Sequence, residues 1–270
     1  MKGEGLTLVN GEPAASLNVM DRGLQYGDGI FRTLKADSGQ LRWWKDQYQK
    51  LSEDCQALGI HCPEEDLLKS EAVRVASNDN VGVVKIVITR GTSARGYKIP
   101  ELAQSTRIVT GFPGAPSISN QVEVRWCKLK LAHQPRLAGI KHLNRLENVL
   151  ARSEWNDPDI CEGLLQDESG HVIGGTMSNL FMVEQGKLIT PDLSGCGVAG
   201  VARQRILRAA MRHGRPVQIE HLDRERLLAA EQVLLCNSLI GVWRVGRLET
   251  RGWPDNGWAD KLKFWLNEDH

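Results

Sequence analysis

Short apolar runs at strand spacing make up much of the first third of the chain. Leu6–Val9 leads into the Asn10-Gly11 pair, which is typical of tight turns, and so predicts an opening hairpin. Ile30–Leu34 follows a Gly-Asp-Gly turn, and Val83–Thr89 is rich in β-branched residues, so both are predicted to be strands. These runs indicate a sheet in the N-terminal part.

The clearest helical pattern in this part runs from Trp44 to Leu58 and stops at Gly59. Its apolar positions recur every three or four residues, which places them on one face. They are Tyr48, Leu51, Cys55 and Leu58. With a second helix before the Val83–Thr89 strand, the predicted order is strand, turn, strand, helix, helix, strand.

The C-terminal part mixes strands with two or three helices. Ile173–Val183 and Leu188–Thr190 flank a tight turn and are predicted to be strands, as is the short apolar run Val233–Cys236. Ala202–Arg212 has the helical period, with Gly214 as its C-terminal cap. The side chains expected to face inward are Ile206, Leu207, Ala210 and Met211.

A stretch rich in Gly, Pro and Ser at residues 111–120 separates the two parts, because this composition disfavours both helix and strand. We predict a smaller N-terminal domain over residues 1–111, a linker over 112–120 and a larger C-terminal domain over 121–270. Each part mixes strands and helices, so the predicted fold class is α+β in two domains.

The composition argues against several classes of partner. Apolar residues make up 41% of the 270 residues, enough for a core, and the formal net charge is +1. Because acids and bases are interspersed, we expect no broad basic surface for nucleic acid or an anionic membrane. No segment is apolar over the length that spans a bilayer, so we predict an unexported protein with no membrane partner.

The cysteines and histidines give no metal pattern. The six cysteines are scattered, with no Cys-x-x-Cys pair and no histidine at zinc-finger spacing. They predict reduced thiols in a cytoplasm. The seven histidines form no His-Glu-x-x-His motif, so we predict no metal site.

Lys141 stands where a Gly-containing loop passes into a helical pattern. The apolar positions after it have helical spacing and are expected to bury one face, which would hold the exit of the loop fixed. They are Leu143, Leu146, Val149 and Leu150. An amine shielded from water has a lowered pKa and can attack an aldehyde, so Lys141 is a candidate for Schiff-base chemistry.

The residues around Lys141 resemble the lysine motif of the bacterial 4-amino-4-deoxychorismate lyases, pyridoxal-phosphate enzymes related to the branched-chain and D-amino-acid aminotransferases. The motif here is Gly139-Ile-Lys-His-Leu-Asn-Arg-Leu-Glu147. Five more segments are similar to motifs of this family, stand in the family's order and span nearly the whole chain: Asp21–Phe31, Thr89–Tyr97, Ser178–Phe181, Cys196–Val201 and Leu235–Ser238.

The resemblance implies the two-domain fold type IV of pyridoxal-phosphate enzymes, as in the D-amino-acid aminotransferases, with pyridoxal 5'-phosphate held on Lys141 as a Schiff base. It implies a small-molecule substrate and a lyase reaction that converts 4-amino-4-deoxychorismate to 4-aminobenzoate and pyruvate, towards folate. The freed Lys141 would remove the proton from the amine-bearing ring carbon. The resemblance also implies a homodimer.

The Gly-rich stretch before the predicted helix at 202–212 can point backbone N–H groups at an anion, aided by the positive end of the helix. The resemblance places the cofactor phosphate there. Lys50 stands at the arginine of the family's His-x-x-Arg-Leu pattern, where lysine keeps the charge but loses the bidentate fork. The residues assigned to the cofactor are Lys50, Asn144, Arg145, Ser178, Asn179, Gly200, Val201, Ala202, Asn237 and Ser238.

The substrate implied by the resemblance carries two carboxylates, so cations are expected around it. The loop at Thr89–Tyr97 resembles the substrate side of the family. The residues assigned to the substrate are Arg90, Arg95 and Tyr97, with Tyr26 nearby.

One position departs from the family. Many relatives have a glutamate five residues before the Asn of Asn-Leu-Phe, where it bonds the pyridine nitrogen and keeps the ring a good electron sink. This chain has Gly174 there. Either another group or a water serves the nitrogen, or the electron-sink character is reduced.

Two other functions stay open. One is an aminotransferase of the same fold that acts on D- or branched-chain amino acids, although the Lys141 motif and the missing acid favour the lyase. The other is a cofactor-binding protein without catalysis, to which Gly174 and Lys50 point.

Overall fold

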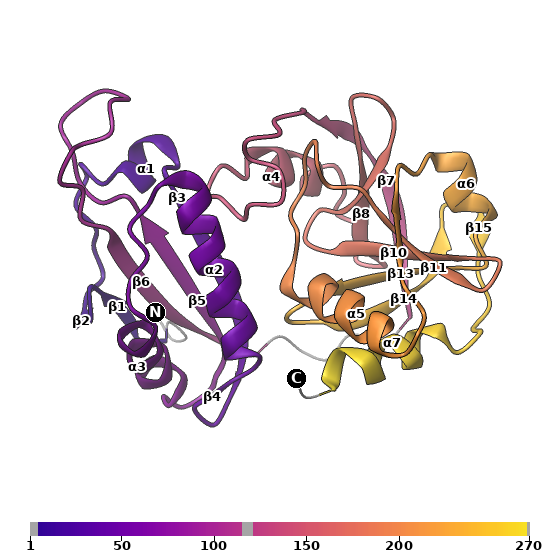
Figure 1. Cartoon of the computed structure of the whole chain (residues 1–270), viewed down its shortest axis with the longest axis horizontal. Helices are drawn as coiled ribbons and strands as arrows, with labels where there is room; N and C mark the ends of the chain where they lie inside the picture. Colours follow the sequence, from indigo (N-terminus) through magenta and orange to yellow (C-terminus); the bar gives the residue numbers. More distant parts are fainter. Residues whose placement is uncertain (1–4, 115–120, 269–270) are drawn as a thin grey trace. The chain divides into compact units, whose positions relative to one another are not determined.

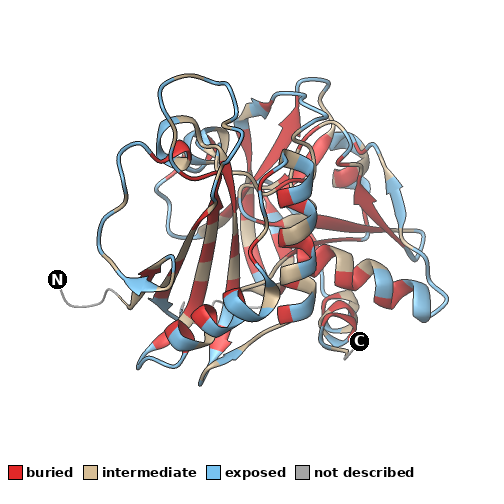
Figure 2. Ribbon diagram, turned by 60° about the vertical axis from the view of Figure 1, so that its left-hand side comes forward, coloured by how far each residue is buried: buried red, intermediate tan, exposed pale blue. Residues whose placement is uncertain are grey.

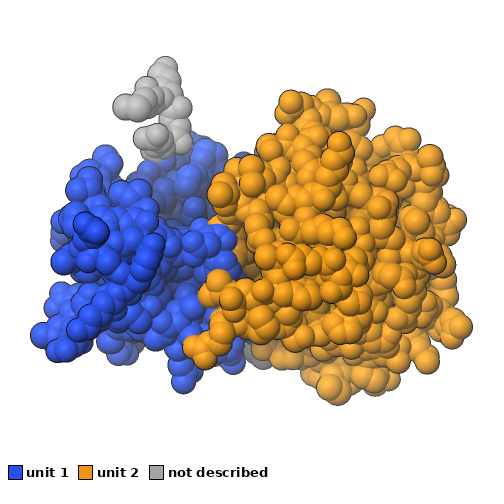
Figure 3. Space-filling view, turned by 90° about the horizontal axis from the view of Figure 1, so that it is seen from above, with its two compact units in different colours: residues 1–117, 140–144 blue, residues 118–139, 145–270 orange. Residues whose placement is uncertain are grey.

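The computed structural model describes residues 5–114 and 121–268. The chain forms two compact units, shown in different colours in Figure 3: unit 1 contains Met1–Ser117 and Ile140–Asn144, and unit 2 contains Ile118–Gly139 and Arg145–His270. Each unit has its own sheet and its own helices (Figure 1). This arrangement confirms the predicted α+β fold class.

The division differs in detail from the single predicted boundary. Strand β6 (Thr106–Pro113) occupies the start of the predicted linker at 112–120, and residues 115–120 lie outside the described residues. The segment Ile140–Asn144, which carries Lys141, belongs to unit 1 although the chain has already entered unit 2. Composition marks a linker but gives no sign of such a return.

Within residues 5–114, unit 1 is built on a six-stranded antiparallel sheet. Its strands follow the order β2 (Glu12–Pro13), β1 (Thr7–Val9), β6 (Thr106–Pro113), β5 (Val81–Thr89), β3 (Gly29–Asp37) and β4 (Gln40–Leu41). Its helices are α1 (Arg22–Tyr26), α2 (Trp44–Leu58) and α3 (Glu65–Ala76). The predicted hairpin and the two predicted strands are confirmed.

Helices α2 and α3 pack on this sheet, and their buried residues form the core of unit 1 together with those of the strands; buried positions are coloured red on the ribbon in Figure 2. Leu51 and Cys55 of α2 lie in one cluster with Leu34 of β3 and Ile86 of β5. The predicted face of α2 is confirmed. Gly59 ends the helix with φ 62°, a left-handed conformation that glycine adopts without a Cβ clash.

Unit 2 contains a nine-stranded mixed sheet in the described part of the chain. Its strands follow the order β12 (Gln218–Glu220), β11 (Lys187–Pro191), β10 (Asn179–Glu184), β13 (Gln232–Asn237), β14 (Gly241–Leu248), β7 (Gln121–Leu131), β8 (Ile160–Asp167) and β9 (Val172–Gly175), with β15 (Arg251–Gly252) beside β14. The helices are α4 (Leu146–Arg152), α5 (Val201–Arg212), α6 (Arg224–Ala229) and α7 (Trp258–Asn267).

The strand and helix patterns of unit 2 need two corrections. The predicted strand Ile173–Val183 is split, because β9 ends at Gly175 and β10 begins at Asn179. Helix α5 ends as predicted before Gly214, which has φ 63°, but Met211 is exposed rather than buried. Helical spacing identifies a face without fixing its edges.

Helix α4 corrects the expected burial after Lys141. Its apolar residues Leu146, Val149 and Leu150 are 68%, 62% and 50% exposed, whereas Ala151 is buried. The apolar stripe is present, but the described residues leave it exposed. None of the helices in the described ranges combines the length and apolar composition needed to cross a bilayer.

Candidate functional site

Lys141 lies on a segment that pairs with strand β3 of unit 1. Its carbonyl accepts the N–H of Phe31 (3.0 Å), and the N–H of Leu143 donates to the carbonyl of Gly29 (2.9 Å). Ile140, directly before the lysine, is buried in the core of unit 1. The Nζ of Lys141 lies 4.5 Å from the centre of the Phe31 ring. The sheet therefore supplies the rigidity that the sequence pattern attributes to the following helix.

Two residues assigned to the cofactor also belong to unit 1. Lys50 is buried on α2, and its ammonium bonds to the carboxylate of Asp54, one helical turn later. The Asn144 amide donates to the carbonyl of Gly27 (3.1 Å), at the turn that ends α1. Sequence reasoning misses Asp54, because an acid on a helix normally lies on its solvated face.

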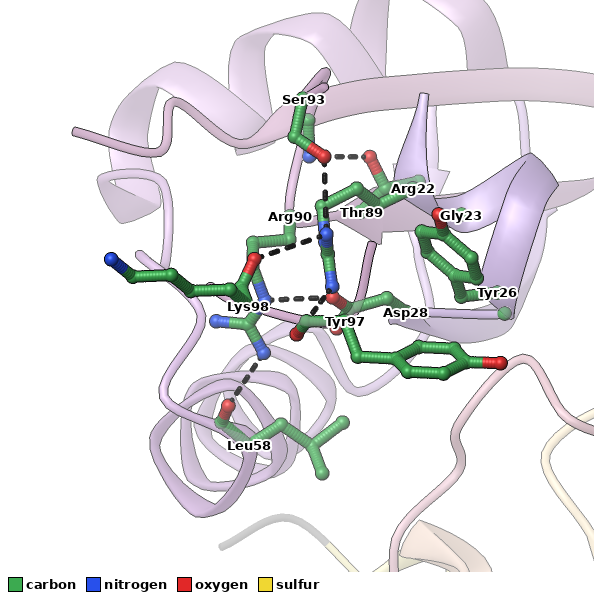
Figure 4. Close-up of polar contacts among 12 residues, drawn as sticks. Arg22, Gly23, Tyr26, Asp28, Leu58, Thr89, Arg90, Ser93, Tyr97 and Lys98 are labelled. Carbon is green, nitrogen blue, oxygen red and sulfur yellow. Dashed lines mark hydrogen bonds and ion pairs between the residues drawn. The ribbon is translucent and has the colours of Figure 1, made fainter. Parts of the chain in front are cut away.

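A pair of arginines around Asp28 ties α1 to the end of β5 (Figure 4). The Nε atoms of Arg22 and Arg90 both donate to Oδ2 of Asp28, each at 2.8 Å. Arg90 is buried and also donates to the carbonyls of Gly59 (2.6 Å) and Leu58 (2.8 Å). The guanidinium of Arg90 is therefore occupied by structural hydrogen bonds within unit 1.

The loop that follows β5 is tied to α1 through Tyr26 (Figure 4). The Tyr26 hydroxyl accepts the N–H of Gly96 (3.0 Å), and the Tyr26 ring meets the Tyr97 ring edge-on at 5.4 Å. Tyr97 is 86% exposed, and the exposed guanidinium of Arg95 has no hydrogen bond to any described residue. The geometry thus favours Arg95 over Arg90 as the cation for a substrate carboxylate.

In unit 2, Asn179 clamps the Gly-rich loop before α5. Its side chain accepts the N–H of Gly200 (3.0 Å) and donates to the carbonyl of Val198 (2.7 Å). The loop also exchanges two main-chain hydrogen bonds with Gly139, at 2.9 and 3.1 Å. Asn179 therefore stabilises the conformation of this loop.

The first turn of α5 offers backbone donors to an anion. The N–H groups of Val201 and Ala202 have no acceptor among the described residues, and no side chain caps this end of the helix. A Cβ at Gly200 would meet the amide oxygen of Asn179, so a larger residue there would have to displace the side chain that accepts the Gly200 N–H. Unpaired N–H groups at the positive end of a helix suit a phosphate.

Glu162 of β8 organises the turn between β9 and β10. It is fully buried, and its carboxylate accepts both the N–H and the hydroxyl of Thr176 (3.0 and 2.5 Å). It also accepts the N–H of Met177 (3.2 Å) and the hydroxyl of Ser178 (2.8 Å). Sequence reasoning misses Glu162, although a lone acid inside an apolar run is the signal for such a residue.

Gly174 of β9 lies beside this turn and is buried. A Cβ at this position would stand 2.8 Å from the carbonyl oxygen of Ser178, closer than real Cβ contacts. A glutamate at 174 would therefore require the turn to move. Glu162 does not replace the carboxylate that is missing at position 174, because both oxygens of Glu162 already accept hydrogen bonds from the turn.

Three further residues assigned to the cofactor lie elsewhere in unit 2, at the end of β13, directly after it and directly before α4. The Asn237 side chain accepts two N–H groups of its own loop (2.8 and 2.9 Å) and donates to the carbonyl of Met177 (3.1 Å). Ser238 follows it and is half-buried. Arg145 donates to Asn148 (3.4 Å), and burial lowers the pKa of Arg145 from its ordinary value.

Comparison with known proteins gives the family. The family model described as amino-transferase class IV matches residues 29–248. The chain belongs to this family. Class IV aminotransferases depend on pyridoxal phosphate.

Relatives within the class IV family include lyases and aminotransferases. An aminodeoxychorismate lyase of Vibrio harveyi is 35% identical over 252 residues, which cover 92% of each chain. A putative branched-chain-amino-acid aminotransferase of Methanocaldococcus jannaschii is 27% identical and covers 89% of this chain and 85% of its own. The structure of 4-amino-4-deoxychorismate lyase from Pseudomonas aeruginosa has a TM-score of 0.92 and 41% identity, covering 98% of this chain and 99% of that one. The predicted family and fold type are confirmed.

Each unit by itself can be compared with what the cofactor of this class IV family requires. Unit 1 supplies the amine of Lys141 on a fixed main chain. Unit 2 supplies the open N–H groups of Val201 and Ala202 for the phosphate. The fit is incomplete at the pyridine nitrogen, because position 174 has no carboxylate and no room for one.

Asp28→Asn is expected to destabilise the protein by about 2–3 kcal/mol at neutral pH, because the amide lacks the charge that two arginines bond. Burial raises the pKa of Asp28, but the hydrogen bonds and charges of Arg90 and Arg22 lower it more strongly, so the net pKa lies below its ordinary value. This stabilisation is complete above the unfolded-state pKa of about 4 and is lost as the pH falls through the lower folded-state pKa.

Chemical unfolding of parent and variant from pH 7 downward measures the effect of Asp28→Asn, and the gap in unfolding free energy should close on acidification. The exposed Asp37 of β3 offers a matched control, since Asp37→Asn removes an acid without buried partners. A gap that widens below pH 4 would show that the charge of Asp28 is not what stabilises the cluster.

Gly174→Ala is expected to cost about 1–3 kcal/mol of unfolding free energy, because the added Cβ meets the Ser178 carbonyl and the β9 turn must shift. Gly252→Ala is the matched control, since the nearest atom to a Cβ on this strand glycine lies at 3.7 Å. Urea unfolding of both variants decides the matter. Equal, small losses would mean that the turn adapts and that position 174 can accept a side chain.

Proposed function

We propose that this enzyme is an aminodeoxychorismate lyase, which converts 4-amino-4-deoxychorismate to 4-aminobenzoate and pyruvate, a step towards folate. The observation that carries the proposal is the placement of Lys141. Pairing with β3 fixes this lysine in a chain that is 41% identical to the lyase of Pseudomonas aeruginosa.

Pyridoxal phosphate, when bound, supplies an aldehyde that joins to amines and a ring that withdraws electrons from the carbon bearing the amine. The Nζ of Lys141 holds the cofactor between turnovers. In its neutral form it then takes the proton from the amine-bearing ring carbon of the substrate. The enolpyruvyl oxygen leaves the adjacent carbon, and the ring becomes aromatic as pyruvate forms.

Formation of an aromatic product makes the absence of a carboxylate at position 174 tolerable. Transamination relies on the cofactor ring to store electrons, whereas this elimination is also driven by aromatisation. A site with no acid at position 174 is therefore better suited to the lyase than to an aminotransferase. This favours the lyase over the alternative activity of the same fold.

The exposed residues of the loop after β5 are proposed to hold the substrate. Arg95 has an exposed guanidinium available to a carboxylate, and Tyr97, two residues later, has an exposed ring. Tyr26 supports both by holding the main chain of Gly96. Arg90 contributes indirectly, because its bonds to Asp28 and Gly59 stabilise the backbone from which this loop starts.

The enzyme is proposed to work as a homodimer with α4 in the subunit interface. Leu146, Val149 and Leu150 form an exposed apolar stripe on this helix. A stripe of this kind is typical of a surface that another chain covers. A second copy of the chain is the partner that the family resemblance implies.

The proposed location is the cytoplasm. All six cysteines are free thiols in the structure. Thiols that stay reduced match the redox conditions of the cytoplasm rather than those outside the cell.

Lys141→Ala is expected to abolish both the visible absorbance of the bound cofactor and the formation of 4-aminobenzoate, while the fold is retained. The reason is that the lysine side chain supplies the chemistry, whereas its main chain and Ile140 supply the packing. Absorbance, borohydride labelling and circular dichroism measure these effects, with the exposed Lys45→Ala as control. A variant that turns over at the parental rate would refute the assignment of Lys141.

Arg95→Ala is expected to raise the KM for aminodeoxychorismate by about one to two powers of ten, because a charge-assisted bond is worth about 1.5–3 kcal/mol. Cofactor affinity should stay unchanged. Lys98→Ala removes a positive charge from the same loop and should have a much smaller effect if Arg95 acts by direct contact. A weakened cofactor with an unchanged KM would move Arg95 away from the substrate.

A further inference from the structure

Three charged side chains are buried together in unit 1, next to the segment that carries Lys141. Arg32 of β3 is 2% exposed, and Lys50 and Asp54 of α2 are 8% and 1% exposed. Burying charge is unfavourable unless the charges are paired and hydrogen-bonded. The hydrogen bonds within this cluster therefore indicate which part of the structure each charged side chain stabilises.

The two oxygens of Asp54 serve different partners. Oδ1 accepts from the ammonium of Lys50. Oδ2 accepts from Nη2 of Arg32 and from the main-chain N–H of Lys141, the latter at 3.1 Å. One carboxylate thus contacts the side chain of one lysine assigned to the cofactor and the backbone of the other.

Neutralisation of Arg32 does not explain this geometry. A carboxylate that serves a single arginine favours the bidentate fork, with two parallel N–H bonds. Here Arg32 uses Nη2, while its buried Nε has no acceptor among the described residues. The oxygen of Asp54 that bonds Arg32 is shared with Lys141.

The bond from Asp54 completes the hold on the Lys141 peptide groups. The N–H of Phe31 in strand β3 donates to the Lys141 carbonyl (3.0 Å). The carboxylate of Asp54 in helix α2 accepts the Lys141 N–H. Both main-chain polar groups of this residue are therefore bonded within unit 1. The start of its long side chain is fixed from two elements.

We propose that Asp54 is a positioning residue for Lys141: its buried carboxylate fixes the Lys141 backbone and thereby sets how readily the Lys141 amine meets an aldehyde. Asp54 does not itself act on the substrate. The role rests on the proposed function, in which Lys141 holds the cofactor.

The matched variants Arg32→Met and Arg32→Met with Asp54→Leu test this role. The first removes the guanidinium but leaves Asp54 with Lys50 and Lys141, so it should react like the parent. The second also removes the acceptor for the Lys141 N–H. We expect it to react about tenfold more slowly, the effect of one lost charge-assisted hydrogen bond. Glu53→Gln, on the exposed face of α2, is the control for a lost acid.

The reaction to follow is the condensation of Nζ of Lys141 with an aldehyde, which forms a C=N bond and releases one water. Stopped-flow absorbance measures its rate after cofactor-free protein is mixed with pyridoxal phosphate or with pyridoxal, which lacks the phosphate. A fall with both aldehydes supports positioning of Lys141. A fall with pyridoxal phosphate alone would assign Asp54 to the phosphate through Lys50 and overturn the proposal, as would equal rates in the two variants.

Borohydride trapping and peptide mapping separate this proposal from the proposed function. A label on another lysine in the parent contradicts the assignment of Lys141, whereas a label on Lys141 at rates indifferent to Asp54 contradicts the role of Asp54 alone. Thermal unfolding checks that both variants fold. If the double variant does not, Arg32→Met with Asp54→Ala replaces it, since alanine also removes the acceptor, and parental rates with both aldehydes would again overturn the proposal.

Discussion

The main-chain pairing between Ile140–Asn144 and β3 is the constraint on which the proposed chemistry depends. A lysine side chain is flexible and reaches a defined point only if its backbone is fixed. Strand β4 pairs with β3 only near Ala36 and Asp37, which leaves the other half of that strand to the lysine segment, where Ile30 and His142 form a bridge. The segment therefore gains the rigidity of a whole sheet without being a long strand itself.

The elements that the sequence predicts well are those whose pattern is local. Helix α2 begins at Trp44 and ends at Leu58, directly before Gly59, as predicted, because the helical spacing is followed at once by a glycine that stops it. The hairpin around Asn10-Gly11 follows from its turn residues in the same way. The exposed stripe of α4 was not predictable, since apolar spacing looks the same whether the chain itself or a partner covers it.

The residues that sequence reasoning missed owe their roles to distant parts of the chain. Asp54 is buried where Arg32 and the Lys141 main chain bond to its carboxylate. The sequence of its own helix gives no sign of either contact. Glu162 is buried because a turn at residues 176–178 folds over it. The lysine, the loop proposed for the phosphate and the loop proposed for the substrate were assigned through motif resemblance. Arg90 shows the limit of this method, because the motif locates a residue but does not say whether its donors are already used.

The return of Ile140–Asn144 to unit 1 has a consequence for biosynthesis. The chain emerges from the ribosome N-terminal end first, so the sheet of unit 1 is complete before β7 of unit 2 and the lysine segment have been made. Until then the place of Ile140 in the core is unfilled, and half of the β3 edge offers unpaired N–H and C=O groups to other strands. A nascent chain paused in this interval is open to mispairing at this edge until the segment that carries Lys141 is made and pairs with β3.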